Sequence, residues 1–186
     1  FSGSFKFTNI INNKNIFNDI EETINLMFYS ILSLLRVKDW LKNIIIFIPL
    51  IVSGQLSELN NYSNLILTFI IFCFSASFIY IINDIIDVKS DKLHPLKKHK
   101  KPLASEKLSL KFAYLTSIFI LILISILLYF NFSLLYHLIA YIFLNLLYNF
   151  ILKKIAVVDL LILCIGYIIR LDSGSHSINV ESSFLM

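Results

Sequence analysis

The sequence predicts an all-α integral membrane protein, a helical bundle with about five membrane-spanning helices. Of the 186 residues, 58% are hydrophobic and only 15% are charged, whereas soluble domains are nearer half apolar and a quarter charged. Glycine (4 residues) and proline (3 residues) are scarce, which favours long helices over a barrel rich in turns. Long uncharged runs alternate along the chain with short basic connections.

The N-terminal part of the chain is expected to lie outside the bundle. Residues 1–23 are polar and rich in asparagine, and we interpret them as a tail. Residues 24–186 are predicted to form one membrane helical domain. It begins with an apolar stretch, 24–35, that leads into Arg36 and Trp40. This mixture indicates an interfacial helix whose basic and indole groups lie at the level of the lipid headgroups.

The expected spans follow from the uncharged runs, because a spanning helix needs about 20 mostly apolar residues. They are 37–57, with Lys38 and Lys42 reaching back to the interface, then 59–83, two spans from the long stretch 112–152 divided at Asn131 and Ser133, and finally 155–169, which is apolar except for Asp159.

The distribution of basic residues predicts the orientation of the bundle. Eight lysines lie between positions 89 and 111, and further basic residues cluster at 36–42 and 153–154. The intervening connections, 57–64 and 129–133, contain no Lys or Arg. By the positive-inside rule the basic connections are cytoplasmic. We therefore expect a multi-pass protein of the inner (cytoplasmic) membrane, with its functional site facing the cytoplasm.

An acidic cluster closes the second predicted span on its cytoplasmic side. Asp84, Asp87 and Asp91 fall on one helical face at i, i+3 and i+7, with Asn83 beside them. Three like charges near a bilayer are costly, and a divalent cation relieves the cost. Magnesium binds a few carboxylates together with substrate phosphates, so the cluster predicts a magnesium-diphosphate site. The alternative is a solvated helix end, neutralised by neighbouring lysines.

Two further features accompany the cluster. The segment 94–102 is expected to be a loop because of Pro95 and Pro102, and its lysines either bind phosphate or serve the topology. Asp159 is an intramembrane carboxylate, which indicates a functional residue or a structural partner for Lys154. The chain has no GxSxG motif, no Walker-type glycine loop and no zinc pattern.

Three segments together resemble the UbiA superfamily of intramembrane transferases. They are LLRVKDWLKNIIIFIPL (34–50), YIINDIIDVKSDKLHPLKKHKKPLAS (80–105) and YNFILKKIAVVDLLILCIGYIIR (148–170). The second contains the NDxxDxxxD motif of the family followed by HPxK. The resemblance implies nine spanning helices around a central cavity, with two acidic motifs facing each other at its cytoplasmic side. This chain would supply about five of the nine, and we expect it to be a truncated piece.

Within the superfamily, the pattern is most similar to the decaprenyl-phosphate phosphoribosyltransferase branch. The resemblance implies catalytic and metal-binding roles for Asp84, Asp87 and Asp91, which would hold Mg2+. Asp159 would be catalytic, serving a second metal or the sugar hydroxyls. The substrate-binding residues that it implies are Lys42, Asn43, Asn83, Tyr148 and Lys154. The second acidic motif is incomplete, because Asp159 has no second aspartate near it in the sequence.

The expected function is therefore magnesium-dependent transfer of 5-phosphoribose from phosphoribosyl diphosphate to a polyprenyl phosphate. The partners would be the polyprenyl lipid, the diphosphate donor and the membrane. We do not expect the protein to bind nucleic acid, and the sequence leaves open whether it forms a homo-oligomer. The alternatives are prenyl transfer from a polyprenyl diphosphate to an aromatic acceptor, a cation transporter, and a non-catalytic fragment.

Overall fold

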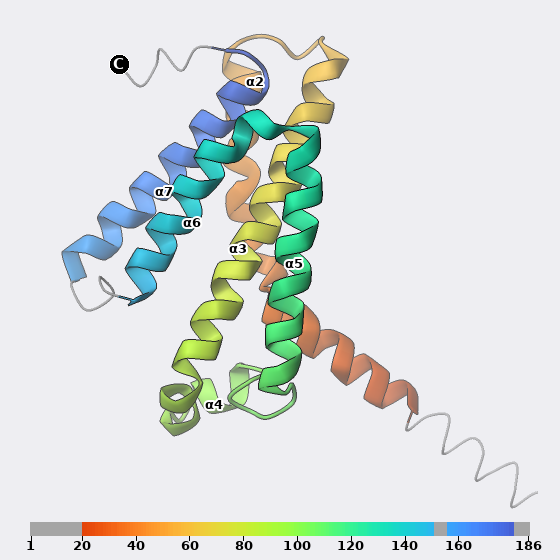
Figure 1. The fold of residues 1–186 in the computed structure, drawn as a ribbon, viewed down its shortest axis with the longest axis vertical. Coiled ribbons are helices and arrows are strands. Elements are labelled where there is room, and N and C mark those ends of the chain that lie inside the picture. The colour runs from red at the N-terminus through yellow and green to blue at the C-terminus, as the bar shows by residue number, and fades with distance from the viewer. Residues whose placement is uncertain (1–19, 151–155, 181–186) are drawn as a thin grey trace, which may run out of the picture.

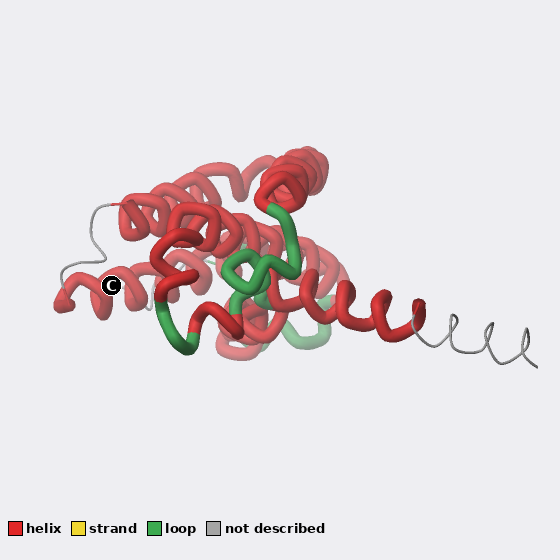
Figure 2. The backbone as a smooth tube through the Cα atoms, turned by 90° about the horizontal axis from the view of Figure 1, so that it is seen from below, coloured by secondary structure: helices red, strands yellow, loops and turns green. Residues whose placement is uncertain are grey.

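The computed structural model describes residues 20–150 and 156–180, and all their regular structure is helical (Figures 1 and 2). Residues 20–35 form a helix that extends away from the bundle. The elements that follow are η1 (Val37–Phe47), α2 (Ile48–Val52), α3 (Leu59–Leu93), α4 (Lys97–Lys100), α5 (Leu110–Phe130), η2 (Phe132–Leu134), α6 (Leu135–Phe150) and α7 (Ala156–Ser177).

The long helix α3 is the centre of the bundle. It packs against η1, α5, α6 and α7, and it supplies the fully buried side chains of Leu65, Ile71, Phe72 and Ile81. Hydroxyl groups within this apolar helix are satisfied locally: Thr68 Oγ1, for example, donates to the carbonyl of Asn64 at 2.8 Å. Such back-bonding lets polar side chains sit in a medium that offers no water.

Three helical stretches of the described residues are long and apolar enough to cross a membrane. They are α3, α5 and the segment Phe132–Phe150, which joins η2 to α6. The all-α membrane fold predicted from the sequence is confirmed. The predicted break near Asn131 is also confirmed: α5 ends there, with Asn131 at φ −145° and ψ 66°, outside the helical region.

The first predicted span is wrong as a continuous helix. Residues 37–47 form a 3-10 helix, and only Ile48–Val52 are α-helical before the chain turns. Pro49 contributes to this break, because it has no N–H to donate to the carbonyl of Ile45, which is bonded instead by the N–H of Ile48. This stretch is not one of the three membrane-spanning candidates.

The other boundaries differ more modestly from prediction. Helix α3 continues ten residues past position 83 to Leu93, so the acidic cluster lies within the spanning helix. Helix α7 continues past position 169 to Ser177 and is not among the three spanning candidates. Residues 20–23, predicted as tail, are already helical, while residues 1–19 lie outside the described part of the chain.

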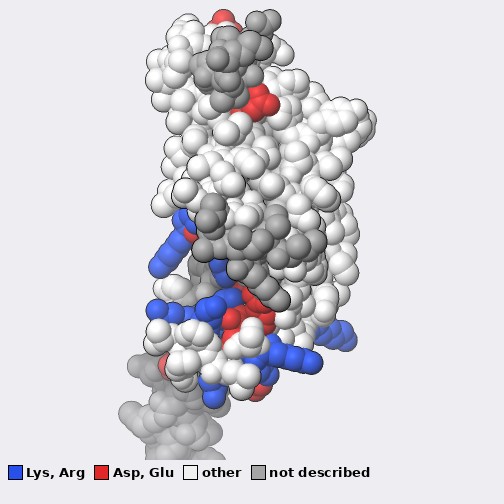
Figure 3. Space-filling model, turned by 90° about the vertical axis from the view of Figure 1, so that its left-hand side faces the viewer, with Lys and Arg blue, Asp and Glu red and all other residues white. Residues whose placement is uncertain are grey.

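The connections alternate between the two ends of the bundle. The C-terminal end of α3, helix α4 and the start of α5 lie together at one end, and α2 and the α5–α6 connection lie at the other (Figure 1). Lysines and arginines gather around acidic side chains at the first end, below a largely uncharged face (Figure 3). This arrangement is the one that the charge pattern predicts, whereas the cytoplasmic orientation stays a prediction.

Candidate functional site

One face of α3 receives the turn between the N-terminal helix and η1. Ser77, Tyr80 and Asp84 follow the i, i+3, i+7 spacing that aligns side chains along a helix. The indole Nε1 of Trp40 donates to Ser77 Oγ at 2.9 Å, and the guanidinium of Arg36 lies 4.4 Å from the centre of the Tyr80 ring. Arg36 and Trp40 are thus docked side by side on α3.

Arg36 holds an uncommon backbone conformation. Its φ of 49° and ψ of 46° place it in the left-handed region, which is uncommon for any residue other than glycine. The side chain compensates, because its Nη2 donates to Asp84 Oδ1 at 2.9 Å. The strained turn therefore directs a guanidinium onto the first aspartate of the acidic cluster.

A single lysine connects the two ends of the cluster. Lys101 Nζ lies 2.8 Å from Asp84 Oδ1 and 2.7 Å from Asp91 Oδ2. Lys97 Nζ approaches the other oxygen of Asp91 at 3.7 Å. Both aspartate side chains are only 3% exposed, so these cations offset the cost of burying the two carboxylates.

The pKa of Lys101 reflects this position. Burial by itself lowers the pKa of the ammonium, but the hydrogen bonds to Asp84 and Asp91 and their negative charges outweigh it. The net effect raises the pKa of Lys101 above its ordinary value of 10.5. Lys101 is therefore a permanent cation at neutral pH.

A pocket of about 620 Å³ opens beside the cluster. The helix at 20–35, η1, α3 and the segment 100–102 all contribute to its walls. Its charged lining consists of Arg36, Lys38, Asp39, Asp84, Lys100 and Lys101. Four cations against two carboxylates give the lining a positive balance, which favours an anionic ligand.

Three other residues predicted to bind metal or substrate are Asp87, Asn83 and Lys42. Asp87 and Asn83 are half-buried on α3. The ammonium of Lys42 pairs with Asp39 at 2.7 Å and is 46% exposed, so it does not belong to the ion pairs of Asp84 and Asp91. These substrate and metal assignments stay predictions.

Asn43 belongs to a different, fully buried network. Its Oδ1 accepts a hydrogen bond from Arg170 Nε at 2.7 Å, and its Nδ2 donates to Cys73 Sγ at 3.2 Å. Arg170 Nη2 also donates to the Tyr141 hydroxyl at 2.7 Å, and its Nη1 to the Gly166 carbonyl at 3.0 Å. The network joins η1 to α6 and α7, so the structure gives Asn43 a role in packing; its substrate-binding role is still a prediction.

The residues predicted at the second acidic motif can be followed only in part. Tyr148 is half-buried near the end of α6. Lys154 lies outside the described residues, and so does the side chain of Asp159, whose backbone belongs to the first turn of α7. The predicted meeting of Asp159 with the first acidic cluster stays a prediction.

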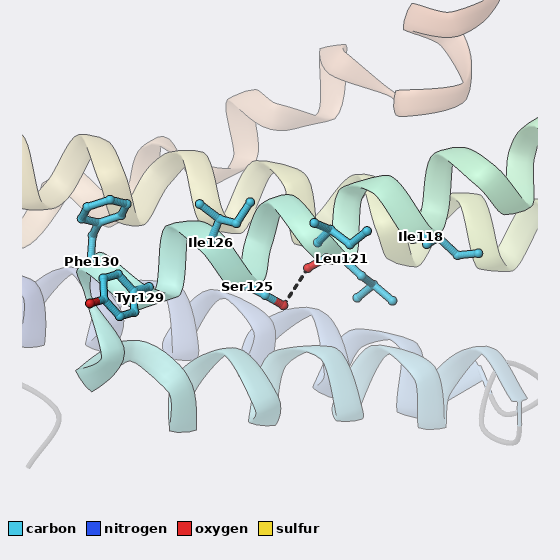
Figure 4. A pocket seen from close by; sticks show the side chains of 7 residues that line it. Ile118, Leu121, Ser125, Ile126, Tyr129 and Phe130 are labelled. Atoms are coloured by element: carbon cyan, nitrogen blue, oxygen red, sulfur yellow. Dashed lines mark hydrogen bonds between the residues drawn. The ribbon is translucent and has the colours of Figure 1, made fainter.

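A second pocket, of about 640 Å³, lies along the outer face of α5 and is almost entirely apolar. Its residues include Ile118, Leu121, Ile126 and Phe130, and the hydroxyl of Ser125 is hydrogen-bonded to the Leu121 carbonyl of its own helix at 2.9 Å (Figure 4). Its polar groups are limited to this serine hydroxyl and the hydroxyl of Tyr129, and it has no charged side chain to bind a headgroup. Such a surface fits acyl chains rather than reacting groups.

Sequence reasoning did not single out Arg36 or Lys101 as site residues, although both lie in segments that it used. Arg36 was identifiable from its position four residues before Trp40, which places both on one side of a helical turn. Lys101 is one of eight lysines between positions 89 and 111. Nothing in the local pattern distinguishes it from the others, because its contact with the aspartates depends on the path of the loop.

The residues of the cluster fit a divalent cation in one respect. Asp84 and Asp91 both present an oxygen to the same positively charged nitrogen, so their carboxylates already converge on one cation. Magnesium is commonly held by one or two carboxylates, with water and substrate phosphates completing its shell. In the described part of the chain no three His, Cys, Asp or Glu side chains form a group that could hold a metal by themselves. The site thus suits a metal that arrives with an anionic substrate.

Comparison with known proteins identifies the family. The model of the UbiA prenyltransferase family matches residues 44–175, a stretch that includes α3, its acidic cluster and most of α7. This chain belongs to the UbiA prenyltransferase family.

The relatives of this UbiA-family chain include several decaprenyl-phosphate phosphoribosyltransferases. The decaprenyl-phosphate phosphoribosyltransferase of Corynebacterium glutamicum is 30% identical over 154 residues, which cover 80% of this chain and 46% of the relative. The enzyme of the same name from Mycolicibacterium smegmatis is 31% identical over 154 residues, covering 80% of this chain and 48% of the relative. The nodulation protein NoeC of Azorhizobium caulinodans is 43% identical over 74 residues, 40% of this chain and 24% of that protein. The chain thus spans about half the length of the phosphoribosyltransferases that it matches.

Proposed function

We propose that this UbiA-family protein transfers 5-phosphoribose from phosphoribosyl diphosphate to a polyprenyl phosphate, with Mg2+ as cofactor. The observation that carries the proposal is the convergence of Asp84 and Asp91 on one cation beside a pocket with a positive lining. The names of the two phosphoribosyltransferases support the choice of donor and acceptor.

The reaction breaks the bond between C1 of the ribose and the diphosphate oxygen, and forms a bond from C1 to a phosphate oxygen of the lipid. Magnesium bound at Asp84 and Asp91, with Asp87 beside them, would neutralise the diphosphate as it leaves. Arg36 and Lys100 in the pocket would contact phosphate oxygens. The buried position of Asp84 and Asp91 would help to keep water from the sugar carbon when that carbon carries positive charge.

The remaining predicted residues would complete the site around the donor and acceptor. Asn83, Lys42 and Lys154 would position phosphate oxygens, and Asp159 would contact a second metal or the sugar hydroxyls. The exposed apolar faces of α5 and α7 are suited to the lipid tail. Because phosphoribosyl diphosphate is a water-soluble anion of the cytoplasm, we place the site on the cytoplasmic face of the inner membrane.

The test uses the protein at its natural length in membranes, supplied with labelled phosphoribosyl diphosphate, a polyprenyl phosphate and Mg2+. We expect label in the lipid fraction, and a loss on the order of 100-fold with D84N or D91N. E106Q is the matched control. Glu106 is an exposed carboxylate in the connection between α4 and α5, and it forms an ion pair with Lys92, which does not contact Asp84 or Asp91. E106Q should retain the wild-type rate.

Two outcomes would contradict the proposal. Transfer of an isoprenoid to hydroxybenzoate, with no labelled phosphoribosyl lipid, would assign the protein to aromatic prenyl transfer. Cation flux in liposomes without release of diphosphate would assign it to transport.

A further inference from the structure

Basic side chains surround two of the aspartates of the acidic cluster. Asp84 and Asp91 together meet three basic side chains, Arg36, Lys97 and Lys101. This pair of aspartates is therefore already neutralised by the protein itself. A divalent cation added to the same pair would leave a large positive excess in a buried region, unless a resident cation moved away.

Lys101 is the cation that occupies the position between the two aspartates, where a metal ion would bind. Its Nζ lies within 2.8 Å of one oxygen from each aspartate. Magnesium binds carboxylate oxygens at about 2.0–2.1 Å, so an ion coordinated by the same two oxygens would overlap the ammonium or lie against it. Like charges at that separation in a poorly solvated site repel strongly. The metal and the Lys101 ammonium cannot share this position.

The structure also provides a place for the displaced side chain. Lys101 lines the 620 Å³ pocket as well as the cluster, and its side chain is 18% exposed. A lysine ammonium sits on a flexible stem of four carbons and can swing without movement of the backbone. Its backbone is held in place, because Lys101 N donates to the Lys97 carbonyl at 3.0 Å.

We propose that Lys101 is a built-in competitor for the metal: it bridges Asp84 and Asp91 when no metal is bound, and swings into the pocket when a divalent cation enters. This inference rests on the proposed function, because it takes the acidic cluster as the metal site. The exchange makes the metal site weak until an anionic donor in the pocket accepts the released ammonium. Metal and donor then bind cooperatively, and the metal-free cluster stays folded without them.

The test is a titration of Mn2+ into the purified protein, followed by the loss of the free-ion signal in electron paramagnetic resonance. We expect K101Q to bind Mn2+ about tenfold more tightly than the wild type, because the competing charge is gone. K101R retains a cation that can bridge the carboxylates and should bind as weakly as the wild type. K98Q is the matched control: it removes the same charge three residues away, from an exposed lysine outside the ion pairs of the cluster, and should leave the affinity unchanged.

A second measurement addresses folding. If K101Q is unstable, K101M keeps the apolar stem and removes only the ammonium, and thermal unfolding identifies which variant is suitable for the titration. D91N in the K101Q background should abolish the gain, which locates the bound ion at the cluster.

The inference is overturned if K101Q and K101M bind Mn2+ no more tightly than the wild type, or if no variant shows saturable binding. Labelled transfer measured on the same preparations separates this failure from that of the proposed function. Transfer that depends on Mg2+ and Asp84, together with an unchanged Mn2+ affinity in K101Q, refutes the competition by Lys101 alone.

Discussion

Helix α7 contains two glycines whose surroundings predict opposite effects of the same substitution. At Gly174 an added Cβ would lie 2.1 Å from the Ile46 carbonyl oxygen and 3.2 Å from Ile46 Cα, both backbone atoms of η1. At Gly166 the nearest atom would be Arg170 Nη1 at 3.5 Å, an ordinary contact at the end of a long side chain. Only Gly174 is required by close packing between elements.

The magnitudes follow from these distances. Alanine is more favourable than glycine in a helix interior by about 1 kcal/mol, so G166A should be neutral or slightly stabilising. G174A gains the same propensity but must push α7 away from η1, and overpacking of this kind costs about 1–3 kcal/mol. The shift also disturbs the hydrogen bond of 2.7 Å between Thr68 Oγ1 and Ser177 Oγ, a loss of about 1 kcal/mol.

The assay is thermal unfolding of the two purified variants in detergent, followed by far-UV circular dichroism. The free energies of unfolding should differ by about 2–3 kcal/mol, which corresponds to roughly 5–10 °C between the midpoints. G174A should unfold at the lower temperature. A midpoint for G174A equal to that of the wild type, or a loss in G166A as large as in G174A, would refute the packing that places α7 on η1.

Two further predictions concern the basic residues. R170K should lower the free energy of unfolding by about 2–4 kcal/mol, because one ammonium cannot replace the bonds of the guanidinium to Asn43, Tyr141 and the Gly166 carbonyl; a chemical denaturation midpoint equal to that of the wild type would contradict this. For Lys101, the raised pKa means that its contribution to stability is fully present below its unfolded value of 10.5 and is lost as the pH rises through the higher folded value. The difference in unfolding temperature between wild type and K101M should therefore be constant from about pH 6 to 9 and shrink only above about pH 10.5; shrinkage near pH 8 would show that the ammonium is not held by the carboxylates.

The positions of most helices could be predicted from the sequence, because uncharged apolar runs of sufficient length form helices, and such runs are visible in the local composition. The uncharged run that begins at Leu59 became α3, and the division at Asn131 separates α5 from η2 and α6. The first span could not be predicted, because its apolar composition is compatible with several backbone forms. Its 3-10 helix follows the left-handed turn at Arg36, whose side chain is held by Asp84 of α3, and such a contact between distant segments is not visible in the sequence.

The acidic cluster was predictable as a set of residues, whereas its partners were not. The spacing of Asp84 and Asp91 by itself determines that they lie two turns apart on one face of a helix, because helical periodicity is a local property. Which cation meets them was decided only by the tertiary structure. Arg36 reaches Asp84 across 48 positions of sequence, and Lys101 reaches both carboxylates through the fold of the loop after α4. Ion pairing depends on distances between segments, and those distances exist only once the segments are packed.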